Sequence, residues 1–405
     1  MFSFPQPALP RPRRRAIGQA LPALLGCWFA LSPQLGLTQS EYDTFEEGAV
    51  DSALERLLNK LGADGGYDSS KKFDFSIIPG PFYTPELEFG VGLAATGLYQ
   101  ADRSGRSPVS SVGANAFVST NGAIGIDLTN YTYLRGDTTR LVVGLELTNA
   151  PDVYYGIGYD LNQREDNREE FIWTHVKFEP KWLQRITEHL LLGAGLSATF
   201  SSADCRKAPQ CGDGSGSGTP FPDDSQSIGI SGHLLFDSRD YPLSPSRGQL
   251  MSVDVTRYPG ALGSDSQFTA VELNFSSFHA LQRAQGVLAW QVKADLNGGE
   301  VPWDHLAKAG GAKALRGYLE GRYRDRQLVL AQLEYRRPLH RRHGMVAWLG
   351  AGAIADRLDE LQLGQLLPTV GIGYRLEVKQ RVNLRLDLGV GDQAVGFYFG
   401  INESF

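Results

Sequence analysis

The sequence has 405 residues, of which 42% are hydrophobic, a fraction that is ordinary for a folded protein. Its net charge of −6 gives no support for a nucleic-acid-binding protein, which needs a basic patch or stripe. Glycine (47 residues), phenylalanine (20) and tyrosine (16) are abundant and methionine (3) is scarce, a composition that suits strands at a lipid boundary better than packed helices.

The N-terminal region predicts export. Residues 11–15 read Arg-Pro-Arg-Arg-Arg and precede an apolar run from Ala16 to about Leu31, which is the pattern of a signal peptide. We therefore expect a signal peptide over residues 1–38. Beyond it, no run of 18 apolar residues occurs without charges or breakers, which excludes a transmembrane helix. A membrane protein of this kind must then be a closed β-barrel.

Two other interpretations of this region stay open. Leu24-Leu25-Gly26-Cys27 resembles a lipoprotein box with Cys27 as the lipidated residue, although the apolar run continues beyond it. Arg14 and Arg15 could belong to a twin-arginine signal, although a barrel must cross the inner membrane unfolded.

Residues 39–80 are expected to form a short periplasmic segment. Leu54, Leu57, Leu58 and Leu61 recur at helical spacing and indicate an amphipathic helix. The segment is too short for a periplasmic domain of ordinary size.

From residue 81 to residue 405 the hydrophobic pattern has a period of two. Ile124, Ile126 and Leu128, for example, alternate with Gly125 and Asp127, which would place apolar side chains in lipid and polar ones in a lumen. A soluble sandwich also alternates. The signal peptide, the lack of helices between strands and the alternation of short with long connections favour an all-β, 16-stranded antiparallel transmembrane barrel in the bacterial outer membrane, with both termini periplasmic. The expected strands lie near residues 86–100, 107–118, 123–135, 138–148, 152–160, 168–181, 187–201, 226–237, 248–258, 266–280, 285–297, 326–338, 343–355, 368–377, 382–391 and 395–405.

Cys205 and Cys211 lie in a loop rich in Gly, Ser, Asp and Pro. A closely spaced pair in an exported protein favours a disulfide, and the alternative is two free thiols. No His or further Cys joins them at zinc-type spacing, so we expect no metal site and no cofactor.

The chain ends on an alternating aromatic segment. Phe397, Phe399, Ile401 and Phe405 share one parity, and such a strand closing on Phe405 resembles the signal by which outer-membrane proteins are recognised for insertion. The alternative is an ordinary edge strand, which would invite aggregation unless it were paired by closure of the barrel.

Three segments carry a resemblance to a family. The first is Leu315-Arg316-Gly317-Tyr318, within the long connection 298–325. The second is the turn between two central strands, with Asp237, Arg239, Asp240, Pro242 and Gly248. The third is Gly371-Ile-Gly-Tyr-Arg375 followed by Asn383-Leu-Arg-Leu-Asp387. In this order and spacing they resemble the BamA/TamA superfamily, also called the bacterial surface antigen family.

The resemblance implies a role for the long connection. In that family the loop arginine folds back into the barrel and pairs with acidic residues of the inner wall. Carried over, the arginine is Arg316, and Asp387 and Glu334 are its candidate partners because both have lumen-facing parity. A guanidinium–carboxylate pair is bidentate and directional, and Gly317 permits a tight turn beside it.

The function that the resemblance implies is assembly or translocation of outer-membrane proteins, or envelope and lipid homeostasis. The sequence departs from the family because it leaves no room for the periplasmic POTRA modules. The expected partners are outer-membrane lipid, the barrel-assembly machinery during insertion, and client or accessory periplasmic proteins, but no nucleic acid. The alternative is a structural or pore-forming barrel without a protein client.

The sequence gives no sign of an enzyme. It contains no His-Glu-x-x-His, Gly-x-Ser-x-Gly or phosphate-binding loop motif. His340 and His343 lie in a basic turn, where a solvated interface turn is favoured over a metal or lipid-phosphate contact. Hydrolases also occur on barrels, and the histidines without a recognisable partner spacing are His175, His189, His233 and His279.

Overall fold

The computed structural model describes residues 70–84, 87–102, 107–205, 223–282, 285–340, 342–379, 381–392 and 395–405. The expected signal peptide, the helix around Leu54–Leu61 and Cys211 lie outside the described residues. Within the described part of the chain, no helix has the length and apolar character needed to cross a membrane.

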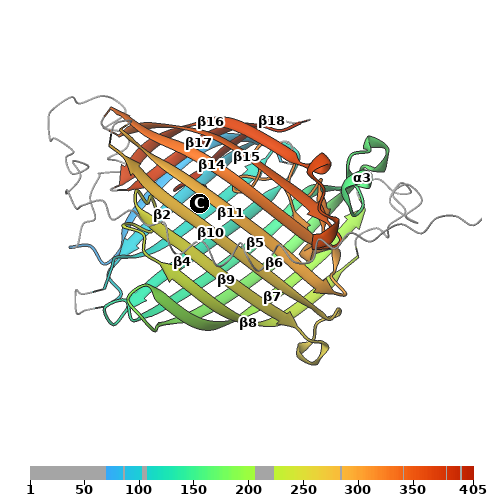
Figure 1. The fold of residues 1–405 in the computed structure, drawn as a ribbon, viewed down its shortest axis with the longest axis horizontal. Helices are drawn as coiled ribbons and strands as arrows, with labels where there is room; N and C mark the ends of the chain where they lie inside the picture. Colours follow the sequence, from blue (N-terminus) through green and yellow to red (C-terminus); the bar gives the residue numbers. More distant parts are fainter. Residues whose placement is uncertain are drawn as a thin grey trace, which may run out of the picture. The chain divides into compact units, whose positions relative to one another are not determined.

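The described residues form a closed antiparallel barrel of sixteen strands, which confirms the expected fold class (Figure 1). Each strand pairs with its neighbours in sequence, except that β11 pairs directly with β14 and β1 meets β18 at the closure. The barrel strands are β1 (Asp74–Thr84), β2 (Glu88–Tyr99), β3 (Ser110–Ser119), β4 (Ile124–Leu134), β5 (Thr139–Tyr154), β6 (Glu169–Arg185), β7 (Leu190–Cys205), β8 (Ser225–Asp237), β9 (Gly248–Tyr258), β10 (Phe268–Leu281), β11 (Gly286–Gly299), β14 (Gln327–His340), β15 (His343–Ala355), β16 (Leu367–Lys379), β17 (Val382–Val390) and β18 (Val395–Ile401).

The connections differ between the two ends of the barrel. The longest ones follow β5, β7, β11 and β15 at the end where α3 lies in Figure 1, and the opposite end has mainly short turns. The two strands between β11 and β14, β12 (Ala307–Lys308) and β13 (Arg324–Asp325), pair with each other instead of joining the wall. The short helices of the long connections are α3 (Tyr159–Asn162), η2 (Glu165–Asn167), η3 (Gly260–Leu262), η4 (Trp303–His305), η5 (Leu358–Glu360) and η6 (Leu363–Gln365).

Side chains alternate between the two faces of the wall as the period of two predicts. Ile124 and Ile126 are 54% and 45% exposed on the outer face, whereas Gln291, Gln332 and Glu334 are buried on the inner face. Large apolar side chains continue on the outer face around the barrel, including Val91, Leu192, Ile230, Met251, Leu349 and Ile372. A continuous apolar exterior of this kind is stable only in lipid.

The strand count was predicted correctly, but two of the individual strands were wrong. The sequence analysis missed β1, and it expected a separate strand over residues 152–160. Residues 152–154 instead extend β5, and the chain then turns into α3. The two errors compensate in number, but β2, β3, β4 and residues 139–148 of β5 run in the direction opposite to the one expected. Residues 74–80, expected in the periplasmic segment, belong to the wall.

Two prolines explain why β1 was missed. Pro79 and Pro81 look like strand breakers, yet the pairing of β1 with β2 continues through both of them. An antiparallel pair needs an N–H at alternate residues, so the two proline nitrogens must face away from β2. Pro180 of β6 shows the contrary case, because the pairing of β6 with β7 is interrupted beside it. The nitrogens of Pro79 and Pro81 therefore face the closure of the barrel.

At the closure, the edges of β1 and β18 overlap and do not form a continuous ladder of hydrogen bonds. Within the described residues β1 pairs with β18 only at Tyr83 and Phe397. The ring of Phe399, on the outer side of β18, packs against Gly80 and Gly92 on the inner side of β1 and β2. The lumen-facing Ile78 likewise joins a cluster with Leu376, Val378, Val382, Leu384 and Ile401 from the outer side of β16 to β18. The C-terminal edge thus lies inside the N-terminal edge.

The last strand ends at Ile401 and does not continue to residue 405 as expected. Asn402 has a φ of 67°, which turns the chain away from the strand. Phe405 then packs against Phe278, with the ring centroids 6.4 Å apart, in a cluster with Val287 and Ala289 of the inner wall. Phe405 therefore leaves the outward parity of β18, and its role as an insertion signal stays a prediction.

Candidate functional site

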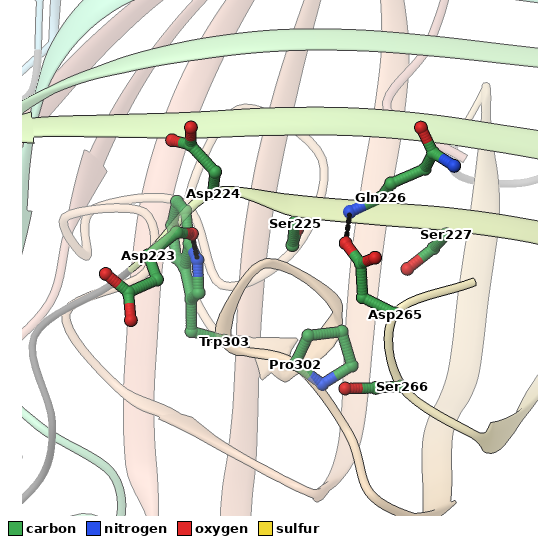
Figure 2. Close-up of a pocket in the computed structure, with 9 residues that line it drawn as sticks. All are labelled: Asp223, Asp224, Ser225, Gln226, Ser227, Asp265, Ser266, Pro302 and Trp303. Carbon is green, nitrogen blue, oxygen red and sulfur yellow. Dashed lines mark hydrogen bonds between the residues drawn. The ribbon is translucent and has the colours of Figure 1, made fainter. Parts of the chain in front are cut away.

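The connection from β11 to β14 folds into the lumen and contacts three parts of the wall. On the descending side, Trp303 donates its indole N–H to the carbonyl of Asp223 (2.7 Å), beside β8 (Figure 2). Lys308 lies 4.0 Å from the centre of the Trp173 ring of β6. On the returning side, Arg324 donates to the carbonyl of Val153 of β5 (3.0 Å). The segment, which we call the luminal loop (residues 300–326), therefore crosses the barrel interior.

The tip of the luminal loop carries Arg316, which is fully buried. Its Nη1 donates to Oδ2 of Asp387 (2.6 Å), and its Nη2 donates to Glu334. The guanidinium also stacks on the ring of Trp348, 3.7 Å from the ring centre. The structure thus brings together the three residues selected from the sequence. Two carboxylates and an aromatic face replace the water that a buried guanidinium loses.

A wider ion network surrounds this pair. Glu334 also accepts from Arg336 (2.9 Å) and from the hydroxyl of Ser404 (2.7 Å). Asp387 also accepts from Arg375 (2.6 Å), which in turn donates to Glu403 (2.8 Å). Since these residues come from β14, β16, β17 and the segment after β18, the network around Arg316 joins three strands of the wall and the C-terminal segment to one loop. Removing one partner would leave an uncompensated buried charge.

Backbone geometry at the tip requires glycine. Gly317 has a φ of 111°, and a Cβ there would lie 2.5 Å from the backbone nitrogen of Gly391 after β17. A Cβ at Gly389 would likewise lie 2.7 Å from the carbonyl carbon of Arg316. The loop backbone therefore lies directly on the backbone of β17. Leu315 adopts a left-handed φ of 51°, a conformation that a branched residue rarely holds without surrounding support.

Hydrogen bonds and packing hold the other motif residues. The backbone N–H of Gly317 donates to the hydroxyl of Tyr398 of β18 (2.9 Å). Tyr318 donates its hydroxyl to the carbonyl of Pro368 (2.9 Å), and its burial raises the pKa of Tyr318 to about 12. Leu315 and Tyr318 lie in a buried cluster with Tyr323, Leu328, Leu330, Ile354 and Leu367. The tip is thus packed and not solvated.

The second motif forms the turn between β8 and β9, at the short-turn end. Asp237 accepts from Arg239 (2.9 Å) and from Arg140 of β5 (2.9 Å). Asp240 accepts from the backbone of Ser246 (2.9 Å) and from Arg381 (2.7 Å), which follows β16. The turn therefore bridges strands that are not neighbours in the wall.

The remaining residues of this motif shape the turn. Pro242 offers its carbonyl to Arg239 (2.9 Å). Gly248 has a φ of 97° and opens β9 against the backbone of Ser238. Burial alone would raise the pKa of Asp240, but hydrogen bonds from Ser246 and Arg381 outweigh burial and lower it. The carboxylate is therefore the form that holds the turn together.

The other candidates have local roles. Cys205, the last residue of β7, is disulfide-bonded. The described residues contain no group of His, Cys, Asp and Glu side chains arranged to hold a metal ion. Among the histidines, His175 contacts Ser201, His189 contacts Phe236, His279 contacts Ser277, and His343 contacts Tyr374, while His340 pairs with His343 across the β14–β15 turn.

His233 has the most suggestive neighbours. Its Nε2 lies 2.8 Å from Oγ of Ser231, and its Nδ1 is hydrogen-bonded to Asp254. The order of groups is that of a nucleophile relay. Ser231 is only 8% exposed, however, and the strand N–H groups around it belong to the ladders with β7 and β9. Within the described wall, these N–H groups are not available as an oxyanion hole.

Sequence reasoning missed several members of the ion network. Arg375 and Arg385 lie within the quoted third motif, and their lumen-facing parity could have identified them. Trp348 and Glu403 carry no comparable signal, because their proximity to Arg316 and Arg375 depends on how strands far apart in the sequence align across the wall.

The comparisons with known proteins agree with this geometry. Residues 106–405 match the Omp85 superfamily domain, and no curated protein matches the sequence. The barrel is similar to BamA from Haemophilus ducreyi lacking POTRA domains 1-3, with a TM-score of 0.51 and 14% identity over 81% of this chain and 70% of that chain.

Two further solved structures are similar at 10% identity. CdiB from Escherichia coli has a TM-score of 0.54 over 86% of this chain and 68% of that chain, and CdiB from Acinetobacter baumannii has a TM-score of 0.53 over 82% and 60%. The chain thus spans 60% to 70% of the length of these proteins. At this identity the structures show the fold, whereas the domain match covers most of the chain. The resemblance seen in the motifs is confirmed, and the chain belongs to the Omp85 superfamily as an outer-membrane β-barrel.

Proposed function

We propose that this barrel assists the assembly or translocation of outer-membrane proteins by opening between β1 and β18. The observation that carries the proposal is the closure itself. β1 pairs with β2 over eleven residue pairs, but with β18 at the single described pair Tyr83 and Phe397. Because backbone hydrogen bonds dominate the cost of separating strands in lipid, the wall opens most easily at this seam.

The luminal loop decides which side of the seam moves. Arg316 joins β14 and β17, and Gly317 holds Tyr398 of β18, so the C-terminal strands form one braced unit. Tyr318 adds a contact to Pro368 at the start of β16. We expect β1 and β2 to move outward while β14 to β18 stay fixed on the loop.

The prolines restrict where an incoming strand can pair. On the seam edge of β1, Pro79 and Pro81 offer no N–H, whereas Phe75 and Ile77 do. A carbonyl facing a proline nitrogen in lipid would stay unpaired, at a cost of several kcal/mol. An added strand is therefore expected to pair along residues 74–78 and not across the centre of β1.

Site-specific photocrosslinking tests the proposal. A photoreactive residue replaces Phe75 in one variant and Val255, on the distant strand β9, in a matched control. The purified protein is placed in liposomes and given an unfolded eight-stranded outer-membrane barrel protein. Crosslinks at residue 75 and none at residue 255 are expected. Equal crosslinking at both positions, or none at either, would contradict the seam mechanism.

The second candidate is a pore-forming or structural barrel without a client. The polar inner wall favours it, with ion pairs such as Lys177–Glu179 (3.1 Å) and Lys293–Asp295 (3.0 Å). Conductance in planar bilayers separates the two. A barrel that is nearly closed and opens when residues 300–322 are deleted fits an assembly barrel with a luminal plug. A large, steady conductance in both forms fits the pore.

Partners and placement complete the proposal. The apolar outer face contacts outer-membrane lipid, and the barrel-assembly machinery inserts the chain with Phe405 as part of the signal. Client or accessory periplasmic proteins meet the short-turn end, where β1 begins and β18 ends. We expect both termini on the periplasmic side.

A further inference from the structure

A cleft of about 420 Å³ lies at the long-loop end of the barrel, between α3, β13 and the connection from β15 to β16. Three separate segments of the chain meet there: residues 157–161, Asp325 of the luminal loop, and residues 354–365. Its volume falls in the range of small-molecule sites. Four carboxylates line it, from Asp160, Asp325, Asp356 and Glu360.

Asp325 is the unusual member of this group. It is only 5% exposed, and its Oδ1 accepts the N–H of Arg326 (2.8 Å). Its Oδ2 lies beside Gly158 at the cleft, 3.6 Å from where a Cβ would stand, and has no hydrogen-bond partner among the described residues. Burial, then Asp356 and Glu360, raise the pKa of Asp325 to about 6, although Arg326 opposes this. A buried carboxylate with an unused oxygen is poised for a cation.

The surrounding structure holds Asp325 in place. The backbone N–H of Gly158 donates to the carbonyl of Arg324 (3.0 Å), and Arg322 donates to the carbonyl of Asn162 (3.1 Å). β12 and β13 pair through Ala307 and Asp325. The cleft is therefore built on hydrogen bonds between the luminal loop and α3, and it does not depend on a single exposed loop.

The lining indicates the class of ligand. Within the described residues no carboxylates are grouped closely enough to hold a metal ion. The apolar side chains of Ile157, Leu161 and Ile354 share the cleft with the carboxylates. Asp356 already pairs with Arg326 (3.2 Å), whereas Asp160 and Glu360 add negative charge at the opening. An alkyl chain with a cationic end matches this lining better than a hydrated metal ion.

We propose that the cleft binds a small organic cation with a primary ammonium group, which donates to Oδ2 of Asp325 while its alkyl chain lies on Ile157 and Leu161. The bound cation would link the returning side of the luminal loop to α3 and to the β15–β16 connection. No residue of β1 or β18 lines this cleft. The proposal therefore holds whether or not the barrel assembles proteins.

Titration calorimetry with spermidine tests the site on the full chain in detergent at pH 7.5. Asp325→Asn keeps the shape and the contact with Arg326 but removes the charge. The matched control is Asp359→Asn, in the same connection, where Asp359 is exposed and pairs with Arg357 (3.0 Å) outside the cleft. We expect Asp325→Asn to weaken binding by at least roughly tenfold, as for one charge-assisted hydrogen bond, and Asp359→Asn to leave it unchanged.

Two further measurements complete the test: the pH dependence of spermidine binding and the fraction of folded barrel. Spermidine binding should weaken when the pH is lowered from 7.5 to 5, because Asp325, whose pKa is raised to about 6, loses its charge over this range. An equal loss in both variants, absence of spermidine binding, or binding of Mg²⁺ in its place would overturn the proposal. The fraction of folded barrel, read from the gel shift between heated and unheated samples, shows that each variant is folded.

Discussion

The ring of Phe399, on the outer side of β18, packs against Gly80 on the inner side of β1. The two edges of the wall therefore overlap at the closure and are held together by side-chain packing where a ladder would be expected. Gly80 and Gly92 supply the smooth surface that this packing needs. Packing of one aromatic ring is weaker and more easily reversed than a continuous set of hydrogen bonds in lipid.

The overlap predicts the effect of filling the glycine surface. Gly80→Leu would place a side chain where the ring of Phe399 lies and should displace β18 from β1. We expect faster amide hydrogen exchange in residues 395–401, measured by mass spectrometry. Gly232→Leu is the control, because a Cβ at Gly232 meets nothing within 4 Å. Unchanged exchange in the Gly80 variant would show that the packing does not hold the seam.

Restoring the missing donors should have the opposite effect. In Pro79→Val/Pro81→Val, both residues gain an N–H that faces the seam, so β1 and β18 can pair further. Hydrogen exchange in β18 is expected to slow. Pro180→Val makes a matched control, because the nitrogen of Pro180 faces β7 and its replacement should tighten β6–β7 only. If both variants slow exchange in β18 equally, the assigned direction of the nitrogens is wrong.

Breaking the buried ion network should destabilise the barrel strongly. Arg316→Met leaves Glu334 and Asp387 short of a partner and should cost about 3–5 kcal/mol. Arg357→Met removes an exposed pair with Asp359, and its cost should be far smaller because solvent screens that pair. Both values are measured by urea unfolding in liposomes. Similar costs for the two variants would contradict the bracing role of Arg316.

Exchanging the charges of Arg316 and Asp387 is a poor rescue experiment. Asp387 also pairs with Arg375 and lies 3.7 Å from Arg385, so Asp387→Arg would meet two guanidinium groups. A double-mutant cycle of Arg316→Met with Glu334→Gln is more direct. Coupling of roughly 0.5–3 kcal/mol is expected between contacting members of one network.

The pKa of Asp325 predicts how stability depends on pH. The folded carboxyl has a pKa raised to about 6, so the folded state binds its proton more tightly than the unfolded chain does. Ionised Asp325 therefore destabilises the fold, and stability is regained as the pH falls from about 6 toward the ordinary value near 4. Asp325→Asn should be more stable than the natural sequence at pH 7.5 and equal to it at pH 4, by urea midpoint. A variant less stable at pH 7.5 would contradict this sign.

Local pattern and family motifs predicted much of the fold and the site. Alternation with a period of two identifies Glu334 and Asp387 as lumen-facing because each strand needs only its own residues to define its faces. The family motif identified Arg316 as the loop residue that pairs with these two carboxylates. Nothing local could predict Trp348 beneath Arg316, because their contact depends on where the loop enters the barrel.

The misread strands have a common physical origin. Pro79 and Pro81 are tolerated in β1 only because its far edge is almost unpaired, which is a property of the closed barrel and not of the segment. Pro151 has a similar position, since β4 pairs no further along β5 than Asn149. In both cases a proline that reads as a breaker lies where no neighbour needs its N–H.

The central claim is that the seam between β1 and β18 opens during function, and a reversible lock tests it most directly. Tyr83→Cys/Phe397→Cys joins the one described pair of the seam, and Val255→Cys/Val271→Cys joins a pair of β9 and β10 as a control. The measurement is the folding rate of an unfolded eight-stranded barrel protein in liposomes that contain each oxidised variant. The account predicts that the seam lock abolishes the acceleration of folding, that a reductant restores it, and that the control lock has no effect. Full acceleration with the seam locked would contradict the account.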